Sequence, residues 1–244
     1  MAKIFITGST EGIGLLAAEM LLENGHEVVL HARSQERANE ALEKFQIKPK
    51  ILIADLLDIE QIKTLINDLN TLGKFDTIIH NAGVYHSSHK DIFQVNVLAP
   101  YILTTLVKKP KRLIYIGSNM HPRGNLDIEN ITLEGGVDYS TSKLYILMLS
   151  FAFSKQYKDI YINTVDPGWV PTKMANYSAS DSLEDGTKTQ VALAVEDMGK
   201  VTGKYFFHLK EINYFNKADD KILQNKLLQK LDDISKGFMM SNFF

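Results

Sequence analysis

The sequence predicts an α/β fold: a single doubly wound domain whose parallel sheet has about seven strands, with helices on both faces. Short runs that are almost continuously apolar alternate along the 244 residues with longer amphipathic segments. Such runs are typical of strands buried on both faces, and their alternation with helices indicates right-handed crossovers. The chain length suits one large domain, and no repeat or linker rich in Gly, Pro and Ser divides residues 1–244.

Seven runs define the predicted strands in chain order. They are KIFIT (3–7), EVVLH (27–31), KILIA (50–54), DTIIH (76–80), RLIYIG (112–117), IYINTV (160–165) and GKYFFH (203–208). The amphipathic segments between them predict helices at about 12–24, 34–45, 58–71, 90–108 and 139–157. Helical spacing within the third of these segments places on one face Ile59, Ile62, Leu65, Ile66 and Leu69.

A further amphipathic helix is predicted near the end of the chain, over 216–236. Its apolar stripe comprises Ile222, Leu223, Leu227, Leu231 and Ile234. Such a stripe packs against a core or against a partner. Packing on the domain and contact within an oligomer are both open at this point.

Two polar segments interrupt the alternation of strands and helices. Residues 119–137 follow the fifth strand, and residues 166–190 follow the sixth. In open α/β sheets ligands bind beyond the carboxyl ends of the strands, where both segments lie, and long loops in compact domains are usually functional or disordered. We therefore expect loop 166–200 to cover a substrate. Three of its residues could contact the substrate or pack on the domain: Trp169, Met174 and Tyr177.

A glycine-rich turn lies between the first strand and the first helix. The run FITGSTEGIG places Gly8, Gly12 and Gly14 there, with Ser9 and Thr10 as additional hydroxyl donors. Glycine lets the backbone turn tightly and approach a pyrophosphate, whose charge then meets the amide-rich N-terminus of the helix. Because a strand precedes this turn and another follows the helix, the pattern predicts a dinucleotide-binding domain of the Rossmann type.

The end of the second strand indicates which dinucleotide binds. A carboxylate there would bond the ribose 2′-hydroxyl of NAD. The chain instead has His31, Ala32 and Arg33, and its next carboxylate is Glu36. The planar guanidinium of an arginine matches a phosphate bidentately, which suits a 2′-phosphate. The predicted cofactor is therefore NADPH or NADP+, and the alternative is that Arg33 is simply solvated.

Composition narrows the classes of function. The sequence has 45% hydrophobic and 23% charged residues and a formal net charge of −2, so it shows no general attraction to nucleic acid or anionic membranes. No stretch approaches the roughly 18 apolar residues of a membrane span. The opening MAKIFITGS lacks the pattern of a signal peptide. We expect a cytoplasmic protein without a nucleic-acid partner.

Metal binding is not expected. The sequence has no cysteine, so it has no disulfide and no thiolate metal site. His86 and His89 lie in YHSSH, without the acidic pattern of the usual zinc motifs. His86 and His121 follow predicted strands closely, which suits a place at the rim of a site or a structural role.

A tyrosine and a lysine lie one helical turn apart in DYSTSKLYILML. Tyr139 and Lys143 take positions i and i+4 of the predicted helix, so their side chains share a face. The chain has ten tyrosines and many lysines, and such a pair also arises by chance. The pair alone does not separate a catalytic role from a surface role.

The chain resembles the short-chain dehydrogenase/reductase family from residue 3 to about 208. The motifs that carry the resemblance are TGSTEGIG (7–14), HNAG (80–83), Asn96 in FQVNVLAPY, Ser118 in IYIGSN, Tyr139-x-x-x-Lys143 and DPGWVPT (166–172). Their spacing differs from that of epimerase-like relatives and enoyl reductases. The long 119–137 loop and VDPGWVPTKM followed by GTKTQ look most like retinol-dehydrogenase-like reductases and bacterial anthracycline ketoreductases.

The resemblance implies a role for each catalytic residue. Tyr139 would be the general acid that protonates the carbonyl oxygen, and Lys143 would stabilise its phenolate and hold the nicotinamide ribose. A free phenol has a pKa near 10, so a nearby cation that lowers it helps the proton to exchange. Ser118 would donate a hydrogen bond to the substrate oxygen, and Asn96 would hold a water that links Lys143 to solvent. Ser118 and Tyr139 are farther apart than is common in the family, so the loop between them must bulge.

Together with the glycine turn and Arg33, the resemblance gives a full set of cofactor-binding residues. The set comprises Gly8, Ser9, Thr10, Gly12, Ile13, Gly14, Arg33, Asp55, Leu56, Asn81, Ala82, Gly83, Tyr139, Lys143, Pro167, Gly168 and Val170. The implied function is an NADPH-dependent carbonyl reductase or alcohol dehydrogenase acting on a small hydrophobic substrate, because pockets of this kind are mostly apolar. The alternative is a non-catalytic NADP(H)-sensing regulator on the same fold. Candidate assemblies are a homodimer or a homotetramer.

Overall fold

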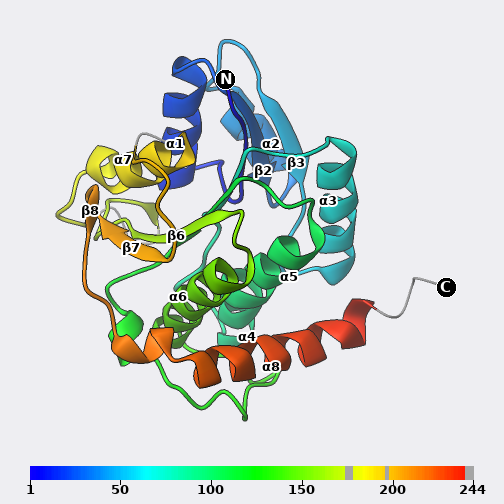
Figure 1. Ribbon diagram of the computed structural model, residues 1–244. Helices are drawn as coiled ribbons and strands as arrows, with labels where there is room; N and C mark the ends of the chain where they lie inside the picture. The colour runs from blue at the N-terminus through cyan, green and yellow to red at the C-terminus, as the bar shows by residue number, and fades with distance from the viewer. Residues whose placement is uncertain (174–177, 196–197, 240–244) are drawn as a thin grey trace.

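One sheet forms the centre of the molecule in the computed structural model, which describes residues 1–173, 178–195 and 198–239 (Figure 1). Its strands are β1 (Lys3–Ile6), β2 (Glu27–Ala32), β3 (Lys50–Ile53), β4 (Thr77–His80), β5 (Arg112–Ile116), β6 (Tyr161–Asp166), β7 (Lys204–Phe207) and β8 (Lys210–Glu211). They run in the order β3-β2-β1-β4-β5-β6-β7-β8. β1 to β7 pair in parallel and β8 is antiparallel to β7. The predicted doubly wound α/β fold with a parallel sheet is confirmed, and β8 is an addition at its edge.

The helices alternate with these strands. They are α1 (Gly12–Glu23), α2 (Gln35–Leu42), α3 (Ile59–Thr71), α4 (His89–Phe93), α5 (Ala99–Leu106), α6 (Tyr139–Gln156), α7 (Leu183–Ala194) and α8 (Lys221–Met239). Side-chain caps fix where several helices begin. At α3 the Asp58 carboxylate accepts from the backbone N–H groups of Glu60 and Gln61 at 2.9 and 3.3 Å, and at α2 the Ser34 hydroxyl accepts from the Arg37 N–H at 3.3 Å.

Two predicted segments differ in detail from the structure. The single helix expected at 90–108 is divided by a π-helical turn, η1 (Gln94–Leu98), between α4 and α5. Within the expected 166–200 loop, α7 begins after Ser182, whose hydroxyl accepts from the Asp185 N–H at 2.9 Å. The polar letters at the start of α7 are cap and first-turn residues, which is why the sequence suggested a loop.

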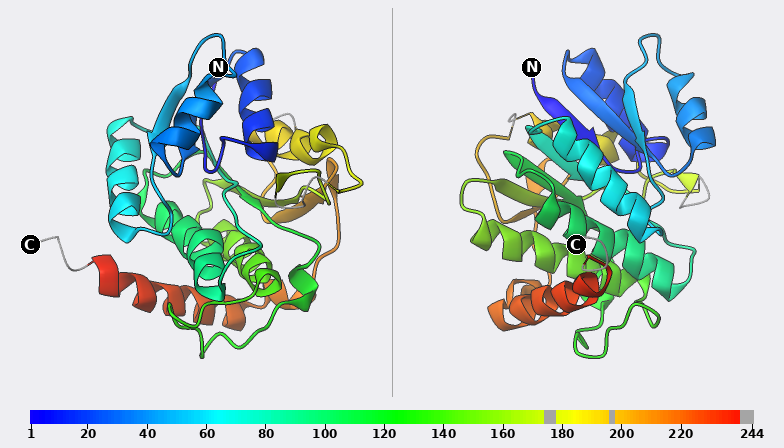
Figure 2. Two further views of the ribbon diagram at one scale, coloured as in Figure 1. Left: turned by 180° about the vertical axis from the view of Figure 1, so that it is seen from behind. Right: turned by 90° about the vertical axis from the view of Figure 1, so that its right-hand side faces the viewer.

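The sheet separates two apolar cores. Along β1, Ile4 and Ile6 belong to the core beneath α1 and α7, whereas Phe5 belongs to the core beneath α3, α5 and α6. This alternation follows from the period of two in a strand. Figure 2 shows the two helical layers on either side of the sheet. No helix within the described residues combines the length and the apolar character needed to cross a membrane.

Helix α8 lies along α6, as Figures 1 and 2 show. Leu227 and Leu231 are completely buried in the same core as α6, and Leu223 packs against it. Ile222, expected on the apolar stripe, is 70% exposed. Residues 223, 227 and 231 recur every four positions, so the face that docks begins at Leu223 and Ile222 points away from it.

Candidate active site

The glycine turn joins β1 to α1 with two backbone conformations that favour glycine. Gly8 has φ +63° and Gly12 has φ +58°. A Cβ on Gly14 would lie 2.3 Å from the Asn81 side-chain nitrogen and 2.6 Å from the Gly8 carbonyl oxygen, so α1 can approach β4 only without a side chain there. Asn81 Nδ2 donates to the carbonyls of Thr7 and Gly8, both at 2.9 Å. Asn81 thus holds the glycine turn through hydrogen bonds to its backbone.

Ser9 faces inward. It is fully buried, its hydroxyl donates to the Ile6 carbonyl at 2.9 Å, and it accepts from the His31 backbone N–H at 2.9 Å. The Ser9 hydroxyl is therefore committed to the fold. Thr10, which is partly exposed and has no hydrogen-bond partner among the described residues, is the hydroxyl of the turn that a ligand could reach.

His31 holds the turn from the side. Its Nδ1 accepts from the Gly8 N–H at 3.0 Å, and its Nε2 lies 2.9 Å from the Ala54 carbonyl, which can only accept. These partners require the neutral ring with the proton on Nε2. Burial lowers the pKa of His31 to about 4, consistent with that form. The ring thus links the ends of β1, β2 and β3.

Two arginines line the rim beside this turn. Arg33 is exposed directly after β2 and forms no hydrogen bond or ion pair with another described residue. Arg37, in the first turn of α2, pairs with Glu11 of the glycine turn and with Glu40, the latter at 3.1 Å. The sequence prediction named Arg33 and did not name Arg37.

The remaining predicted cofactor residues lie beyond β3 and β4. Asp55 accepts from the Leu57 N–H at 3.0 Å, and Leu56 is buried. The Ala82 N–H donates to the Thr7 hydroxyl at 3.0 Å. A Cβ on Gly83 would lie 3.8 Å from Lys143 Nζ, so the backbone after β4 passes close to the predicted catalytic lysine.

Tyr139, Ser118 and Lys143 come together at the end of β5. Tyr139 opens α6, which Asp138 caps by accepting from the Thr141 N–H at 2.7 Å. The phenol of Tyr139 is hydrogen-bonded to the Ser118 side chain. Lys143 Nζ lies 5.4 Å from the centre of the Tyr139 ring and donates to the Ile116 carbonyl at 2.8 Å. The three predicted residues therefore form one constellation.

Burial shifts both ionisable groups toward their neutral forms. It lowers the pKa of Lys143 to about 8, against the opposing charge of Asp166. It raises the pKa of Tyr139, which the hydrogen bond with Ser118 opposes and the charge of Asp166 reinforces. Both directions follow from the cost of a charge away from water.

Asn96 lies in the π-helical turn η1, and such turns are frequent at functional sites. Its Oδ1 accepts from the Val84 N–H at 2.8 Å, and its Nδ2 donates to the Val84 carbonyl at 2.9 Å and to Ser142 Oγ at 3.0 Å. Asn96 thus ties the loop after β4 to α6 beside Lys143.

The 119–137 loop bulges without separating Ser118 from Tyr139. At its start His121 Nδ1 donates to the Ser118 carbonyl at 2.8 Å, and His121 Nε2 accepts from the Phe215 N–H at 3.1 Å. At its end the Val137 N–H donates to the His89 carbonyl at 3.1 Å. His121, buried and bonded at both ring nitrogens, is part of the fold rather than the open rim.

The segment after β6 crosses over the glycine turn. A Cβ on Gly12 would lie 3.1 Å from the Thr172 methyl. Val170 is buried, and Pro167 and Val170 pack against Gly186 of α7. Trp169 is 56% exposed. Two other residues predicted in this cover, Met174 and Tyr177, lie outside the described residues.

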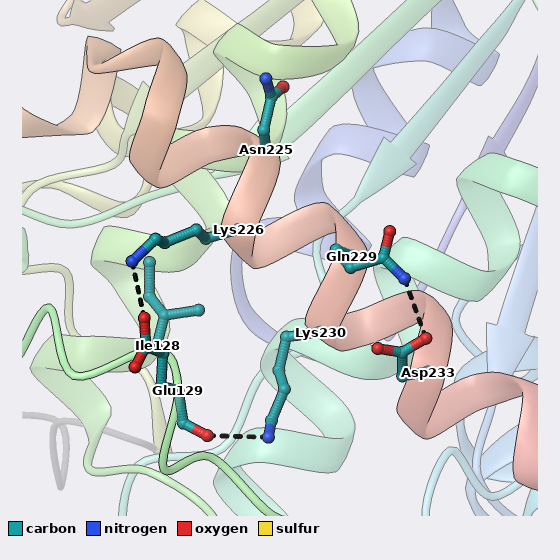
Figure 3. A pocket seen from close by; sticks show the side chains of 7 residues that line it. All are labelled: Ile128, Glu129, Asn225, Lys226, Gln229, Lys230 and Asp233. Carbon is teal, nitrogen blue, oxygen red and sulfur yellow. Dashed lines mark hydrogen bonds and ion pairs between the residues drawn. The ribbon is translucent and has the colours of Figure 1, made fainter.

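Two other kinds of candidate site are a metal site and a surface groove beside α8. Across the described residues no group of three or more His, Asp or Glu side chains could hold a metal ion. A groove of about 510 Å³ lies between the 119–137 loop and α8, away from Tyr139 (Figure 3). There Lys226 pairs with the Glu129 carboxylate at 2.6 Å, and Lys230 donates to the Glu129 carbonyl at 2.8 Å. These contacts fasten α8 to the loop.

Several residues at the site were not predicted from the sequence. Tyr85 lies edge-on to Tyr139, with ring centres 4.6 Å apart, and Thr172 adjoins Gly12. Tyr205 on β7 hydrogen-bonds to Asp166 at 3.3 Å. Tyr85 follows HNAG by two positions, and Asp166 and Thr172 bound the DPGWVPT motif, so proximity to recognised motifs was the available signal. Tyr205 gave no such signal.

Comparison with known proteins agrees with this arrangement. The family model described as short chain dehydrogenase matches residues 2–183. A short-chain dehydrogenase, chyC, of Penicillium rubens is 38% identical over 96% of this chain and 98% of its own. Mouse retinol dehydrogenase 14 is 24% identical over 92% of this chain and 83% of its own. A crystal structure of a blue fluorescent protein from a metagenomic library in complex with NADPH has a TM-score of 0.71 at 21% identity, covering 84% of this chain and 95% of that one.

Proposed function

The chain belongs to the short-chain dehydrogenase family, and from this premise we propose that it is an NADPH-dependent oxidoreductase that interconverts a carbonyl compound and an alcohol. The observation that carries the proposal is the constellation of Ser118, Tyr139 and Lys143 at the end of β5, facing the backbone of Gly83. A proton donor, a hydroxyl and a cation lie within reach of one another there, as acid catalysis at a carbonyl requires.

Each residue has a defined role in this mechanism. The chemistry that bound NADPH supplies is hydride transfer. Burial raises the pKa of Tyr139, so the phenol is protonated at neutral pH and can donate its proton to the substrate oxygen. Ser118 donates a hydrogen bond to the same oxygen as its charge develops. Lys143, held by the Ile116 carbonyl, stabilises the phenolate that Tyr139 becomes.

The choice of NADPH rests on the rim of the glycine turn. The turn has the two left-handed glycines that a close pyrophosphate requires, so the residues present fit a dinucleotide. Beyond β2 lies Arg33, whose guanidinium has no ion-pair partner within the described part of the chain, and Arg37 follows on α2. The sequence has no carboxylate at the end of β2, where a ribose hydroxyl would be bound. The similar fold solved with NADPH supports the same choice.

A small hydrophobic ketone or aldehyde is the proposed substrate class. Tyr85 packs on Tyr139 and on His86, with ring centres 4.6 and 4.5 Å apart, and presents an aromatic edge beside the proton donor. Loop 166–200 is proposed to cover the substrate beside Tyr139. The cytoplasmic location and assembly as a homodimer or homotetramer remain predictions, the latter testable by light scattering.

The test compares Tyr139→Phe with the parent protein on a panel of ketones and aldehydes, with NADPH and NADH side by side. We expect turnover to fall by roughly 10²–10⁴-fold, while NADPH still quenches the fluorescence of the single tryptophan, Trp169. Unchanged turnover in Tyr139→Phe would contradict the mechanism. Tight NADPH binding without turnover by the parent on any substrate would favour the sensing regulator.

A further inference from the structure

We propose that Asp166 is a positioning residue of this site: a buried carboxylate that acts as counter-ion to the Lys143–Tyr139 pair and sets the pH range over which the pair keeps its protons. The role given to Tyr139 rests on the proposed function. The electrostatic interaction of Asp166 with Lys143 does not, and it can be tested without turnover.

Asp166 lies in the same strand-end layer as the catalytic constellation. It is the last residue of β6 and is 3% exposed. Its neighbour Val165 pairs in register with Ile116, whose carbonyl accepts from Lys143, and the Val165 carbonyl accepts from the Gly117 N–H at 2.7 Å. Asp166 is therefore fixed beside the backbone that leads to Ser118.

Its two oxygens are held by neutral donors. Oδ1 accepts from the Gly168 N–H at 3.0 Å, and Oδ2 accepts from the Tyr205 hydroxyl at 3.3 Å. The Tyr205 ring lies edge-on to His121, with ring centres 5.1 Å apart, and packs against Gly117. No ion pair joins Asp166 to another residue in the described part of the chain. A buried carboxylate held this way has its charge balanced at longer range.

Among residues 1–173, 178–195 and 198–239, the charged and titratable groups that interact with Asp166 come from α6, η2 (His121–Arg123) and β7. Lys143 and Tyr139 face it from α6, His121 from η2, and Tyr205 from β7. His121 is neutral, because burial lowers its pKa and both of its ring nitrogens are bonded. Of the described residues, Lys143 is therefore the cation that balances Asp166.

The pKa directions agree with this geometry. Burial raises the pKa of Asp166, and the two hydrogen bonds and the charge of Lys143 oppose that rise. In return, the carboxylate raises the pKa of Lys143 and of Tyr139. Tyr85, packed on Tyr139 from the loop after β4, adds to the rise for Tyr139. Asp166 thus favours the protonated form of both members of the pair.

The sign of the effect follows from coupled titration. When the negative charge is removed, the pair loses its first proton at a lower pH, whichever member loses it. Carbonyl reduction needs Tyr139 protonated and Lys143 charged. The high-pH limb of the reduction profile should therefore move to lower pH.

Asp166→Asn is the direct test. The amide oxygen can still accept from the Gly168 N–H, so the change removes charge with little change of shape. Asp181→Asn is the matched control, because the Asp181 carboxylate holds the same segment through the Trp169 N–H at 2.7 Å and is partly exposed. The first measurement is the NMR chemical shift of the Lys143 ε-carbon as a function of pH, without cofactor; the signal is assigned by its loss in Lys143→Met. The second measurement is the pH profile of carbonyl reduction.

We expect both midpoints to fall by roughly one pH unit in Asp166→Asn and to stay within about 0.2 unit in Asp181→Asn. Unshifted midpoints in a folded Asp166→Asn would overturn the inference. In the parent protein the Lys143 signal should also show a second inflection at acid pH, as Asp166 takes up its proton, and its absence would overturn the inference even if Asp166→Asn does not fold. A shifted NMR midpoint in a protein with no turnover would refute the proposed function alone.

Discussion

At the scale of single residues, Arg33 makes the sharpest distinction between cofactors. Its guanidinium is exposed and has no partner among the described residues, so binding a 2′-phosphate costs it no existing ion pair. Hydrogen bonds to charged groups contribute about 1.5–3 kcal/mol. We expect Arg33→Ala to weaken NADPH binding by roughly 10- to 100-fold and to leave NADH binding nearly unchanged.

NADH is the internal control in this experiment, because it lacks only the 2′-phosphate. Dissociation constants for both cofactors can be measured from quenching of Trp169 fluorescence. Equal weakening of both would show that Arg33 supports the fold of the rim. A loss for neither would transfer the role to Arg37, whose guanidinium is already engaged by Glu11 and Glu40.

The role of a residue could be predicted from the sequence where its type has one dominant structural function. Gly8 and Gly12 do adopt the left-handed conformations that the turn demands. Residues with several uses could not be assigned: Ser9 turns its hydroxyl inward to Ile6 and His31. Asp166 is buried and bonded to Tyr205, although an aspartate before Pro-Gly is usually a turn residue. Direction and burial decide between such uses, and both arise from tertiary contacts.

At the scale of elements, Gly136 fixes the end of the 119–137 loop. It has φ +60°, and a Cβ there would lie 2.1 Å from the carbonyl carbon and oxygen of His89. Gly136→Ala should therefore lower the free energy of unfolding by more than about 2 kcal/mol, because the backbone must move. It should also reduce turnover, since Tyr139 follows three residues later.

Gly73→Ala separates the cost of the strained backbone from the cost of the steric overlap with His89. Gly73 has φ +93°, but nothing lies within 4 Å of its added Cβ. The same methyl group there should cost about 1 kcal/mol, from backbone strain alone. Urea unfolding of the two variants measures the difference. Equal costs would show that the loop is not clamped against α4.

The turn between β7 and β8 is a second strained element. His208 and Leu209 have φ 44° and 64°, the region that hairpin turns of this length usually fill with glycine or asparagine. Leu209 is 47% exposed, so its side chain contributes little packing. We expect Leu209→Gly to be more stable than Leu209→Ala by about 1 kcal/mol in thermal unfolding, because both remove the side chain and only glycine relieves the backbone. Equal stability of the two would contradict this view of the turn.

Element prediction succeeded where apolar spacing is long and regular. The predicted third helix, 58–71, matches α3, with Ile62, Leu65 and Leu69 buried as expected. The π-helical turn η1 has no such signal, because one extra residue in a helical turn leaves the apolar pattern almost unchanged. It is nevertheless the element that carries Asn96.

At the scale of the whole molecule, the question is whether α8 unfolds together with the rest of the domain. The sequence left its partner open between the domain and an oligomer. In the structure Leu227 and Leu231 are completely buried in the core shared with α6, and Lys155 on α6 donates to Gln224 Oε1 on α8 at 3.0 Å. An apolar face buried to this degree ties the unfolding of α8 to that of the sheet.

Leu231→Ala tests this coupling, and Ile222→Ala on the same helix is its control. Removing a fully buried leucine side chain costs about 2–5 kcal/mol, because a cavity remains, whereas Ile222 is 70% exposed and its loss should cost less than about 0.5 kcal/mol. If α8 is part of one cooperative unit, Leu231→Ala lowers the midpoint of a single urea transition that circular dichroism and Trp169 fluorescence report together. An early transition seen by circular dichroism, with the Trp169 midpoint unchanged, would mean that α8 unfolds independently. The 119–137 loop, held to α8 through Glu129, should then become labile with it, and substrate turnover should respond before the sheet unfolds.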